Sequence, residues 1–271
     1  MFLLFDIGGT HTRFSIAPDI NTLSDPLIID TPKNFDEFES RLKYFVEKNL
    51  KNSKLEKIVG GIAGVLDEDG AKLYNSPNLQ DWIGKPLKEV IIRVTGCEDV
   101  TIENDANLCG LGEAVNGGGK DYDIVAYITI GTGIGGTRIV NKKIDENVMG
   151  FEPGHQIIRI SDERKIETFE QLAGGNAIFK KYGKRASEIE DLQIIDDIYF
   201  YTACGIHNAI LHWSPDVVVL GGSLGEDMDL PKLKSYLTEI MHIFKKIPPL
   251  KSAKLGKTNG VIGAFHLLKF G

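Results

Sequence analysis

Two glycine-rich turns in this sequence have the residue types and spacing of phosphate-binding loops. The first, Gly8-Gly9-Thr10, follows an apolar run, and the second, Gly131-Thr132-Gly133, follows a β-branched run that begins at Ile124. Another apolar run comes directly after each turn, so each predicts two strands joined tightly. Because glycine has no Cβ, a ligand such as phosphate can approach the backbone N–H groups. An ordinary β-hairpin turn is the structural alternative for either loop alone.

The recurrence of this pattern in both halves of the chain predicts an internal duplication. The tetrapeptide Ile-Gly-Gly-Thr stands at 7–10 and again at 134–137. Similarity at a spacing of half a chain indicates a duplicated domain, since a solenoid would repeat at a far shorter period. Two facing copies could hold a polyphosphate between them. The pair therefore favours phosphate binding over two unrelated turns.

Asp105 is the candidate for acid–base chemistry. It follows an expected strand at 100–103 and opens an expected helix that runs to about residue 115. It therefore lies at the C-terminal end of a strand, where open α/β sheets hold their ligands. A carboxylate there, flanked by Asn104 and Asn107, is well placed to accept a proton from a substrate hydroxyl. The alternative is that Asp105 only caps the helix.

Two irregular loops carry side chains that suit a polar ligand. The loop at 75–82 contains Asn78 and Trp82, and irregular surface loops of this kind often bind ligands. The alternative for this loop is a plain connection with Trp82 packed over the edge of a core. Glu152 and His155 lie on a loop that proline and glycine constrain, which suits it to holding polar side chains rigidly, although solvated side chains are the simpler reading.

A third candidate ligand site follows a continuously apolar strand that begins at residue 215. This strand runs into Gly221-Gly222-Ser223, which is the pattern of a buried parallel strand with a ligand at its end. Glycines that simply end the strand are the structural alternative.

The remaining elements alternate between strands and helices, which predicts an α/β fold. Apolar residues at helical spacing predict an amphipathic helix at 35–50 between parallel strands. A domain boundary is expected near 105–120, where the glycines at 117–119 could form a hinge. The other expected strands are at 25–30, 57–63, 71–74, 156–160 and 251–255, and the other helices at 86–94, 167–173, 186–192, 194–213, 231–247 and from 260.

Composition excludes several classes of partner. The 271 residues are 42% hydrophobic and carry a formal net charge of −7, which argues against nucleic acid and anionic membranes as partners. Three cysteines without a Cys-x-x-Cys pair support neither a disulfide framework nor a zinc knuckle, so a reducing, cytoplasmic compartment is expected. No apolar run approaches membrane-spanning length, and nothing marks export.

Taken in order, these motifs resemble those of the ROK (repressor, open reading frame, kinase) sugar kinases, within the actin, hsp70 and hexokinase ATPase class. Any one glycine motif is weak, but five in the right order over essentially the whole chain are strong evidence. The first phosphate motif resembles Asp6-Ile-Gly-Gly-Thr10 with Thr12-Arg13, and the second resembles Gly131-Thr-Gly-Ile-Gly-Gly136. The catalytic-aspartate motif resembles Glu103-Asn-Asp-Ala106, and the adenosine motif resembles Gly221-Gly222-Ser223. The sugar signature resembles Glu152-Pro-Gly-His155.

The resemblance implies an α/β fold of two RNase H-like, actin-like ATPase lobes with an interlobe cleft. The N-terminal lobe would span 1–115, with the C-terminal helix at 260–271 packed back on it, and the C-terminal lobe would span 116–259. The implied activity is ATP-dependent transfer of the γ-phosphate to a hexose, with glucose and its 6-hydroxyl expected. N-acetylmannosamine, N-acetylglucosamine and fructose are alternative acceptors. A non-catalytic sugar sensor is the alternative of another class.

The resemblance also implies roles for individual residues. Asp105 would be the general base, and Asp6 would help to position Mg²⁺ through water. These roles match what phosphoryl transfer requires, namely positioning, charge neutralisation and a base. The expected sugar-binding residues are Asn78, Asn104, Asp105, Glu152, His155 and Glu170, and the expected ATP-binding residues are Asp6, Gly8, Gly9, Thr10, Thr12, Arg13, Gly131, Thr132, Gly133, Gly221, Gly222 and Ser223.

Three departures from the family pattern shape these expectations. Most members carry a zinc-binding cysteine cluster after the sugar signature, but 156–170 contains no cysteine, so no zinc is expected and His155 would act only on the sugar. Thr137-Arg138 replace the usual small residues, and the loop is shorter, which leaves the identity of the sugar open. The first phosphate motif starts at Asp6, so no DNA-binding domain is expected. A homodimer is the default expectation for the oligomeric state.

Overall fold

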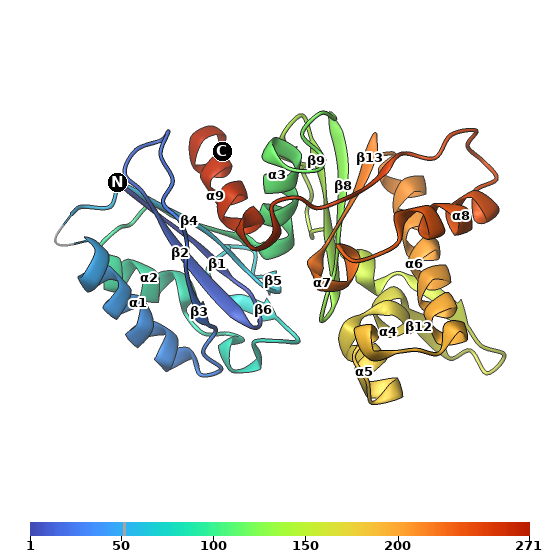
Figure 1. Cartoon of the computed structure of the whole chain (residues 1–271). Helices are drawn as coiled ribbons and strands as arrows, with labels where there is room; N and C mark the ends of the chain where they lie inside the picture. The colour runs from blue at the N-terminus through green and yellow to red at the C-terminus, as the bar shows by residue number, and fades with distance from the viewer. Residues whose placement is uncertain (51–52) are drawn as a thin grey trace. The chain divides into compact units, whose positions relative to one another are not determined.

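The computed structural model describes residues 1–50 and 53–271, which form two compact units (Figure 1). Unit 1 comprises Met1–Gly112 and Lys257–Gly271, and unit 2 comprises Glu113–Gly256. The first of the two chain crossings between the units falls inside helix α3 (Asp105–Asn116). Each unit has its own five-stranded sheet.

The sheet of unit 1 is built on the expected N-terminal hairpin. Strand β1 (Phe2–Ile7) pairs antiparallel with β2 (His11–Ala17), which pairs with β3 (Leu27–Asp30). On its other side β1 lies parallel to β4 (Lys57–Ile62), and β4 lies parallel to β7 (Val100–Asn104). Because these three strands are parallel, their carboxyl ends meet at one edge of the sheet, where α/β proteins place ligands.

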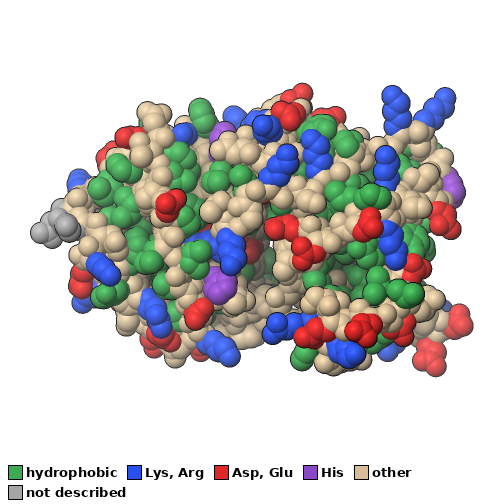
Figure 2. Space-filling model, viewed as in Figure 1, with side chains coloured by type: hydrophobic (Ala, Val, Ile, Leu, Met, Phe, Trp, Pro, Cys, Tyr) green, Lys and Arg blue, Asp and Glu red, His purple; other side chains and the backbone are tan. Residues whose placement is uncertain are grey.

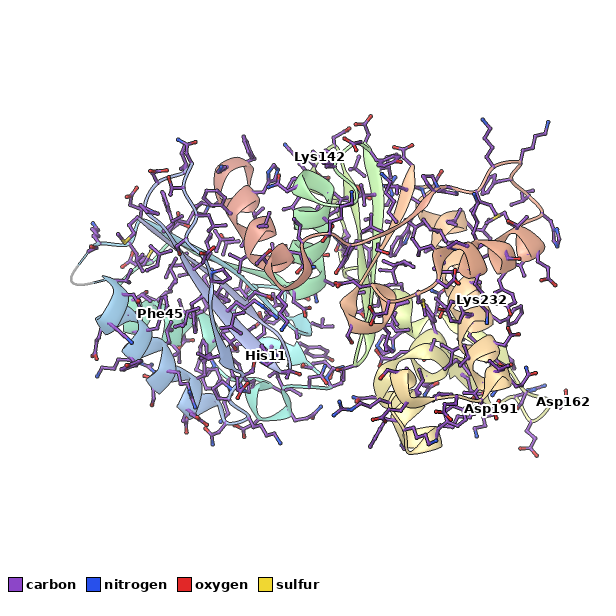
Figure 3. The ribbon with its side chains drawn as sticks, in the orientation of Figure 1. His11, Phe45, Lys142, Asp162, Asp191 and Lys232 are labelled. Carbon is purple, nitrogen blue, oxygen red and sulfur yellow. The ribbon has the colours of Figure 1, made fainter. Side chains whose placement is uncertain are left out.

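Helices cover both faces of this sheet, because alternate residues of each strand point to opposite sides. On one face, α1 (Phe35–Leu50) and α2 (Leu87–Thr95) contribute to a core that includes Phe5 of β1. Phe45 of α1 (Figure 3) stacks on Phe14 of β2, with ring centroids 4.8 Å apart. On the opposite face, α9 (Asn259–Phe270) packs against β1 and β4.

The sheet of unit 2 repeats this topology strand for strand. Strands β8 (Ile124–Ile130), β9 (Ile134–Val140) and β10 (Lys143–Ile144) form an antiparallel meander, and β13 (Val217–Gly221) and β14 (Leu250–Ser252) follow in parallel. The order β10-β9-β8-β13-β14 therefore corresponds to β3-β2-β1-β4-β7 in unit 1. The predicted duplication is confirmed.

The tetrapeptide that suggested the duplication is nevertheless not at equivalent positions. In unit 1 it leads from the end of β1 through the turn, whereas in unit 2 residues 134–137 lie inside β9. The counterpart of the turn after Ile7 is Gly131–Gly133, directly after Ile130. The two units therefore correspond in strand topology and in the position of the glycine turn, but not in the position of the identical tetrapeptide.

Two expected helices of unit 2 are wrong in extent. The segment 186–192 forms only a 3₁₀ turn at Ala186–Glu188, because α6 (Leu192–Trp213) starts later, capped by Asp191. The helix expected at 231–247 ends early, as α8 (Leu230–Ile240). Met241, directly after the helix, is still buried, but Ile243 and Phe244 are 73% and 46% exposed, so no continuous buried apolar face supports a longer helix.

The region between β9 and α6 also contains more short elements than the sequence predicted. A helix expected from residue 167 begins later, as α4 (Phe169–Ala173), and a second helix, α5 (Gly175–Tyr182), follows it. The other short elements of the two units are β5 (Val65–Leu66), β6 (Leu73–Asn75), β11 (Ile157–Ile160), β12 (Ile166–Thr168), α7 (Gly222–Gly225) and the 3₁₀ turns Gln80–Trp82, Pro153–His155 and Gly256–Thr258.

The surface carries charge of both signs. On the face drawn in Figure 2, acidic and basic side chains are interspersed over each unit. Across the described ranges 1–50 and 53–271, every helix is too short or too polar to cross a membrane.

Candidate active site

The first glycine turn is held by its neighbours in unit 1. The N–H of Gly8 donates to the carbonyl of His11 at 3.0 Å, and a Cβ on Gly9 would lie 2.6 Å from the Cβ of Asn78. Asn78 therefore packs against this turn, and only glycine fits there. The hydroxyl of Thr31 donates to the carbonyl of Gly8 at 2.7 Å. Thr31 is a supporting residue that no sequence motif indicated.

Asp6 and Arg13, both expected near ATP, form an ion pair beside this turn. Arg13 Nη1 donates to Asp6 Oδ2 at 2.9 Å, and Asp6 is 4% exposed. Burial raises the pKa of Asp6, while the charge and hydrogen bond of Arg13 oppose that change. Arg13 Nε is buried and, within the described part of the chain, has no hydrogen-bond partner. Such a donor suits an anionic ligand such as a phosphate group.

Asp105 lies at the predicted place, directly after β7 and at the start of α3. Its Oδ1 accepts from the N–H of Ala106 at 2.9 Å, and the residue is half-buried. The Asn104 side chain donates to the carbonyl of Gly64 at 2.9 Å and accepts from the N–H of Asn107 at 3.2 Å. Asn104 therefore fixes the start of the helix that carries Asp105.

Glu103 completes this arrangement and was not among the expected site residues. Its Oε1 accepts from the N–H of Asn104 at 2.8 Å and from the side-chain amide of Asn107 at 2.9 Å. The sequence signal was its place at the head of the Glu-Asn-Asp-Ala motif. The backbone around Asp105 is therefore constrained from both sides.

The second glycine turn, in unit 2, is held by α5 and by Glu170. The N–H groups of Gly175 and Asn176 donate to the carbonyls of Gly131 and Thr132 at 2.8 and 2.9 Å. Glu170 Oε2 accepts from the N–H of Ile134 at 2.7 Å. Glu170, which we expected at the sugar, therefore also anchors the turn expected at phosphate.

Three expected sugar-binding residues, Glu152, His155 and Glu170, lie near one another in unit 2. Loss of hydration raises the pKa of Glu152, nearby His155 lowers it and nearby Glu170 raises it further. The 3₁₀ turn Pro153–His155 packs against β9, since a Cβ on Gly154 would lie 2.1 Å from the carbonyl oxygen of Ile134. Glycine is therefore required within the sugar signature.

The expected adenosine motif borders the second glycine turn. Strand β13 runs parallel to β8, so the segments that follow them are adjacent. Gly222 has φ of 78°, and a Cβ on Gly131 would lie 3.8 Å from Ser223 Oγ. Within unit 2, the second phosphate turn, the adenosine motif and the three sugar residues therefore adjoin one another.

The described residues could hold Mg²⁺ through one carboxylate, with water and substrate phosphates as the other ligands. Residues 1–50 and 53–271 contain no group of three or more His, Cys, Asp or Glu side chains that could hold a metal ion by themselves. Mg²⁺ in phosphoryl-transfer enzymes is held by one or two carboxylates together with water and substrate phosphates. The single carboxylate of Asp6 beside a glycine turn fits that pattern.

A model of the ROK family matches residues 3–270. The chain belongs to the ROK family. An N-acetyl-D-glucosamine kinase from Histophilus somni is 27% identical and covers 98% of each protein. A glucokinase from Streptomyces coelicolor is 24% identical over 97% of this chain and 96% of its own length. These ROK relatives indicate ATP-dependent hexose kinase activity.

The fold of this ROK protein also matches a solved kinase of the family. The crystal structure of a ROK family glucokinase from Streptomyces griseus, in complex with glucose and AMPPNP, superposes with a TM-score of 0.79 at 23% identity. The match covers 99% of this chain and 100% of that one. The expected mixed α/β fold of the actin-like ATPase class is confirmed.

Proposed function

We propose that this ROK sugar kinase transfers the γ-phosphate of ATP to the 6-hydroxyl of glucose, with Asp105 as the general base. The observation that carries this proposal is the placement of Asp105 at the carboxyl end of β7, half-buried and backed by the bonded pair Glu103 and Asn104. A carboxylate fixed in this way can accept the proton of a hydroxyl as that oxygen attacks phosphorus.

In this proposal polar side chains bond the hydroxyls of the sugar. The residues assigned this role are the expected ones, Asn78, Asn104, Glu152, His155 and Glu170. The shared surroundings of the three unit 2 residues support their assignment to one ligand. Holding the acceptor hydroxyl in line converts a bimolecular reaction into an effectively unimolecular one.

The glycine turns would hold the ATP phosphates through backbone N–H groups, and Gly221–Ser223 would border the adenosine. Arg13 would supply its buried Nε donor to a phosphate oxygen. Mg²⁺ positioned by Asp6 would neutralise charge on the phosphates. The cytoplasm, which supplies ATP, is the compartment that the cysteine pattern favours.

The test is phosphoryl transfer from Mg-ATP to glucose, fructose, mannose, N-acetylglucosamine and N-acetylmannosamine, measured as ADP released. We expect glucose to be phosphorylated at its 6-hydroxyl, with the product position assigned by NMR. Absence of turnover on every sugar by folded protein that still binds a sugar would contradict the proposal and favour a sensor.

A further inference from the structure

The turn between β9 and β10 in unit 2 carries a lysine in a backbone conformation that favours glycine. Lys143 pairs with Val140, so Asn141 and Lys142 form a two-residue hairpin turn (Figure 3). Their φ angles are 51° and 63°, as in a type I′ turn, for which Asn-Gly is the preferred pair. A residue with a Cβ is strained there, so the contacts of the Lys142 side chain must compensate for that strain.

The ammonium group of Lys142 lies among three backbone carbonyls of the segment 119–122. Its Nζ donates to the carbonyl oxygens of Tyr122 at 2.7 Å and Lys120 at 2.8 Å, and more weakly to that of Gly119 at 3.4 Å. A carbonyl only accepts, so these contacts require the protonated lysine, which has three N–H donors. The three oxygens form a carbonyl cage around Nζ.

The carbonyl cage is shaped by bonds that do not involve Lys142. The N–H of Tyr122 donates to the carbonyl of Gly119 at 3.1 Å, which closes the turn. The N–H of Gly119 donates to the backbone carbonyl of Glu113 at 3.0 Å. The carboxylate of Glu113 accepts from the N–H of Gly118 at 2.9 Å. These bonds hold the segment in shape independently of the lysine side chain.

The ligands of the carbonyl cage match a monovalent cation. All three are neutral carbonyls, and rings of such carbonyls replace the hydration shell of K⁺ in potassium channels. Ca²⁺ and Mg²⁺ sites instead include carboxylate ligands. Loss of hydration lowers the pKa of Lys142, while the nearby carboxylates of Asp123 and Asp121 favour its charged form. A cation in the cage is therefore partly stripped of water and attracted by its surroundings.

We propose that the carbonyl cage is a monovalent-cation site and that the Lys142 ammonium is its built-in cation. NH₄⁺ and K⁺ have nearly the same radius, so a variant without the lysine ammonium binds either ion in its place. The cage lies in the segment that joins α3 to β8, and the other end of β8 leads into the second glycine turn. The tethered ammonium thus fixes the start of this strand without K⁺. The inference is independent of the proposed function, since no cage residue is among the expected site residues.

The experiment compares thermal unfolding of the wild type, Lys142→Met and Lys143→Met in chloride salts of different cations at equal ionic strength. Tetramethylammonium is too large for the cage, so in its salt Lys142→Met should lower Tm by about 3 °C, because the carbonyls lose a charged donor. KCl and NH₄Cl should restore at least half of this loss, and NaCl less, since Na⁺ is smaller. Lys143→Met is the matched control. Lys143 is the adjacent, exposed lysine, so this variant should respond to the salts as the wild type does.

Lys142→Gly provides a second variant that should fold even if Lys142→Met does not. Glycine adopts the left-handed turn without strain, so this variant would be more stable than the wild type if the lysine side chain made no useful contact. We expect it instead to be less stable than the wild type in the tetramethylammonium salt and to gain stability in KCl.

Anomalous diffraction from crystals grown with RbCl locates the ion directly. We expect a Rb⁺ peak in contact with the carbonyls of Tyr122 and Lys120 in Lys142→Gly, and none at that position in the wild type. The same response of all the proteins to the four salts, or a Lys142→Gly cage without Rb⁺, would overturn the proposal.

Discussion

The aspartates at the carboxyl ends of β1 and β7 have different surroundings, and these surroundings separate their roles. Asp6 is almost completely buried and paired with Arg13, so its charge is already compensated by the protein. Asp105 is half-buried and lies at a helix start. A general base must reach the proton that it abstracts, so Asp105 suits that task and Asp6 suits fixed positioning.

The proposed sugar-binding role of Glu152 predicts a defined pH dependence of sugar binding. Its raised pKa means that the carboxylate becomes protonated at a higher pH than an ordinary glutamate does. A protonated carboxyl accepts hydroxyl hydrogen bonds less well, so KM for the sugar should rise as pH falls, beginning above the usual glutamate range. Steady-state kinetics between pH 4.5 and 8, a range chosen around the ordinary glutamate and histidine values, measures this rise.

The control for this prediction is Glu152→Gln, which cannot titrate. Its KM should be higher by about 10-fold and should change less with pH than that of the wild type. An identical KM profile in the two proteins would show that Glu152 does not control sugar binding.

Glu113 is a structural carboxylate at the start of unit 2. It is fully buried and accepts from the N–H groups of Gly118 at 2.9 Å, Lys254 at 3.0 and 3.1 Å, and Leu255 at 2.9 Å. Glu113→Ala would leave three N–H groups without this acceptor, so the free energy of unfolding should fall by about 3 kcal/mol.

Urea denaturation measures this change, with Glu146→Ala as the control. Glu146 is exposed in the same unit, so its removal should alter stability by less than about 0.5 kcal/mol. Equal stability of the two variants would contradict the role assigned to Glu113.

At the scale of elements, two glycines with left-handed backbone offer a matched comparison. Gly222 and Gly183 have φ of 78° and 69°. A Cβ on Gly222 would lie 2.5 Å from the carbonyl oxygen of Ile130, whereas one on Gly183 would meet nothing within 4 Å. Gly183→Ala should therefore lower the free energy of unfolding by about 1 kcal/mol, the cost of the left-handed backbone alone. Gly222→Ala should lower it by about 3 kcal/mol, because the clash adds to that cost.

Thermal or urea unfolding of the two alanine variants checks this difference. A similar loss of stability in both variants would contradict the expected clash between a Cβ at position 222 and the carbonyl of Ile130. Because Gly222 lies in the proposed adenosine motif, we also expect Gly222→Ala to raise KM for ATP, while Gly183→Ala leaves it near the wild-type value.

The sequence predicted most strands of both sheets because apolar runs bounded by glycine are a local signal. It did not predict β10, which is only Lys143–Ile144. Periodicity in the second half of the chain was less reliable, since the helix expected at 231–247 ends at Ile240 and the apolar side chains Ile243 and Phe244 beyond it are exposed. Trp82 shows the same dependence on tertiary packing. It is 1% exposed and its indole donates to the carbonyl of Pro32 at 3.2 Å, so it belongs to the core of unit 1 rather than to a ligand site.

The candidate site was predictable where a motif brings its residues together in sequence. The Asp105 segment and the two glycine turns are such cases. Thr31 was not predictable because its bond to Gly8 spans 23 residues. The bond of Glu170 to the turn after β8 likewise spans 36 residues and has no local pattern. The roles assigned to the site residues remain predictions that the experiments above address.

At the scale of the molecule, the chain consists of two sheets of the same topology, and its last helix belongs to the first of them. Val261 and Ala264 of α9 are 1% and 0% exposed and pack with Leu4 and Val59 of the unit 1 sheet. This part of the core therefore depends on residues at the opposite end of the chain from β1 and β4.

Removal of residues 257–271 should therefore open unit 1 and spare unit 2. Hydrogen exchange read by mass spectrometry should show loss of protection in β1 and β4, while β8 and β13 stay protected, since each unit has its own core. Removal of residues 270 and 271 alone is the control, because Phe270 is 63% exposed. Unchanged protection of β1 and β4 in the longer deletion would contradict this role of α9.

The central claim is that Asp105 is the general base of a sugar kinase, and kcat of Asp105→Asn tests it most directly. The substitution keeps the size of the side chain and removes its basicity. We predict that kcat falls by about 10²–10⁴-fold while KM for the sugar changes only a few-fold, and that Asp99→Asn, exposed just before β7, keeps the wild-type rate. An Asp105→Asn protein with wild-type kcat would contradict the account.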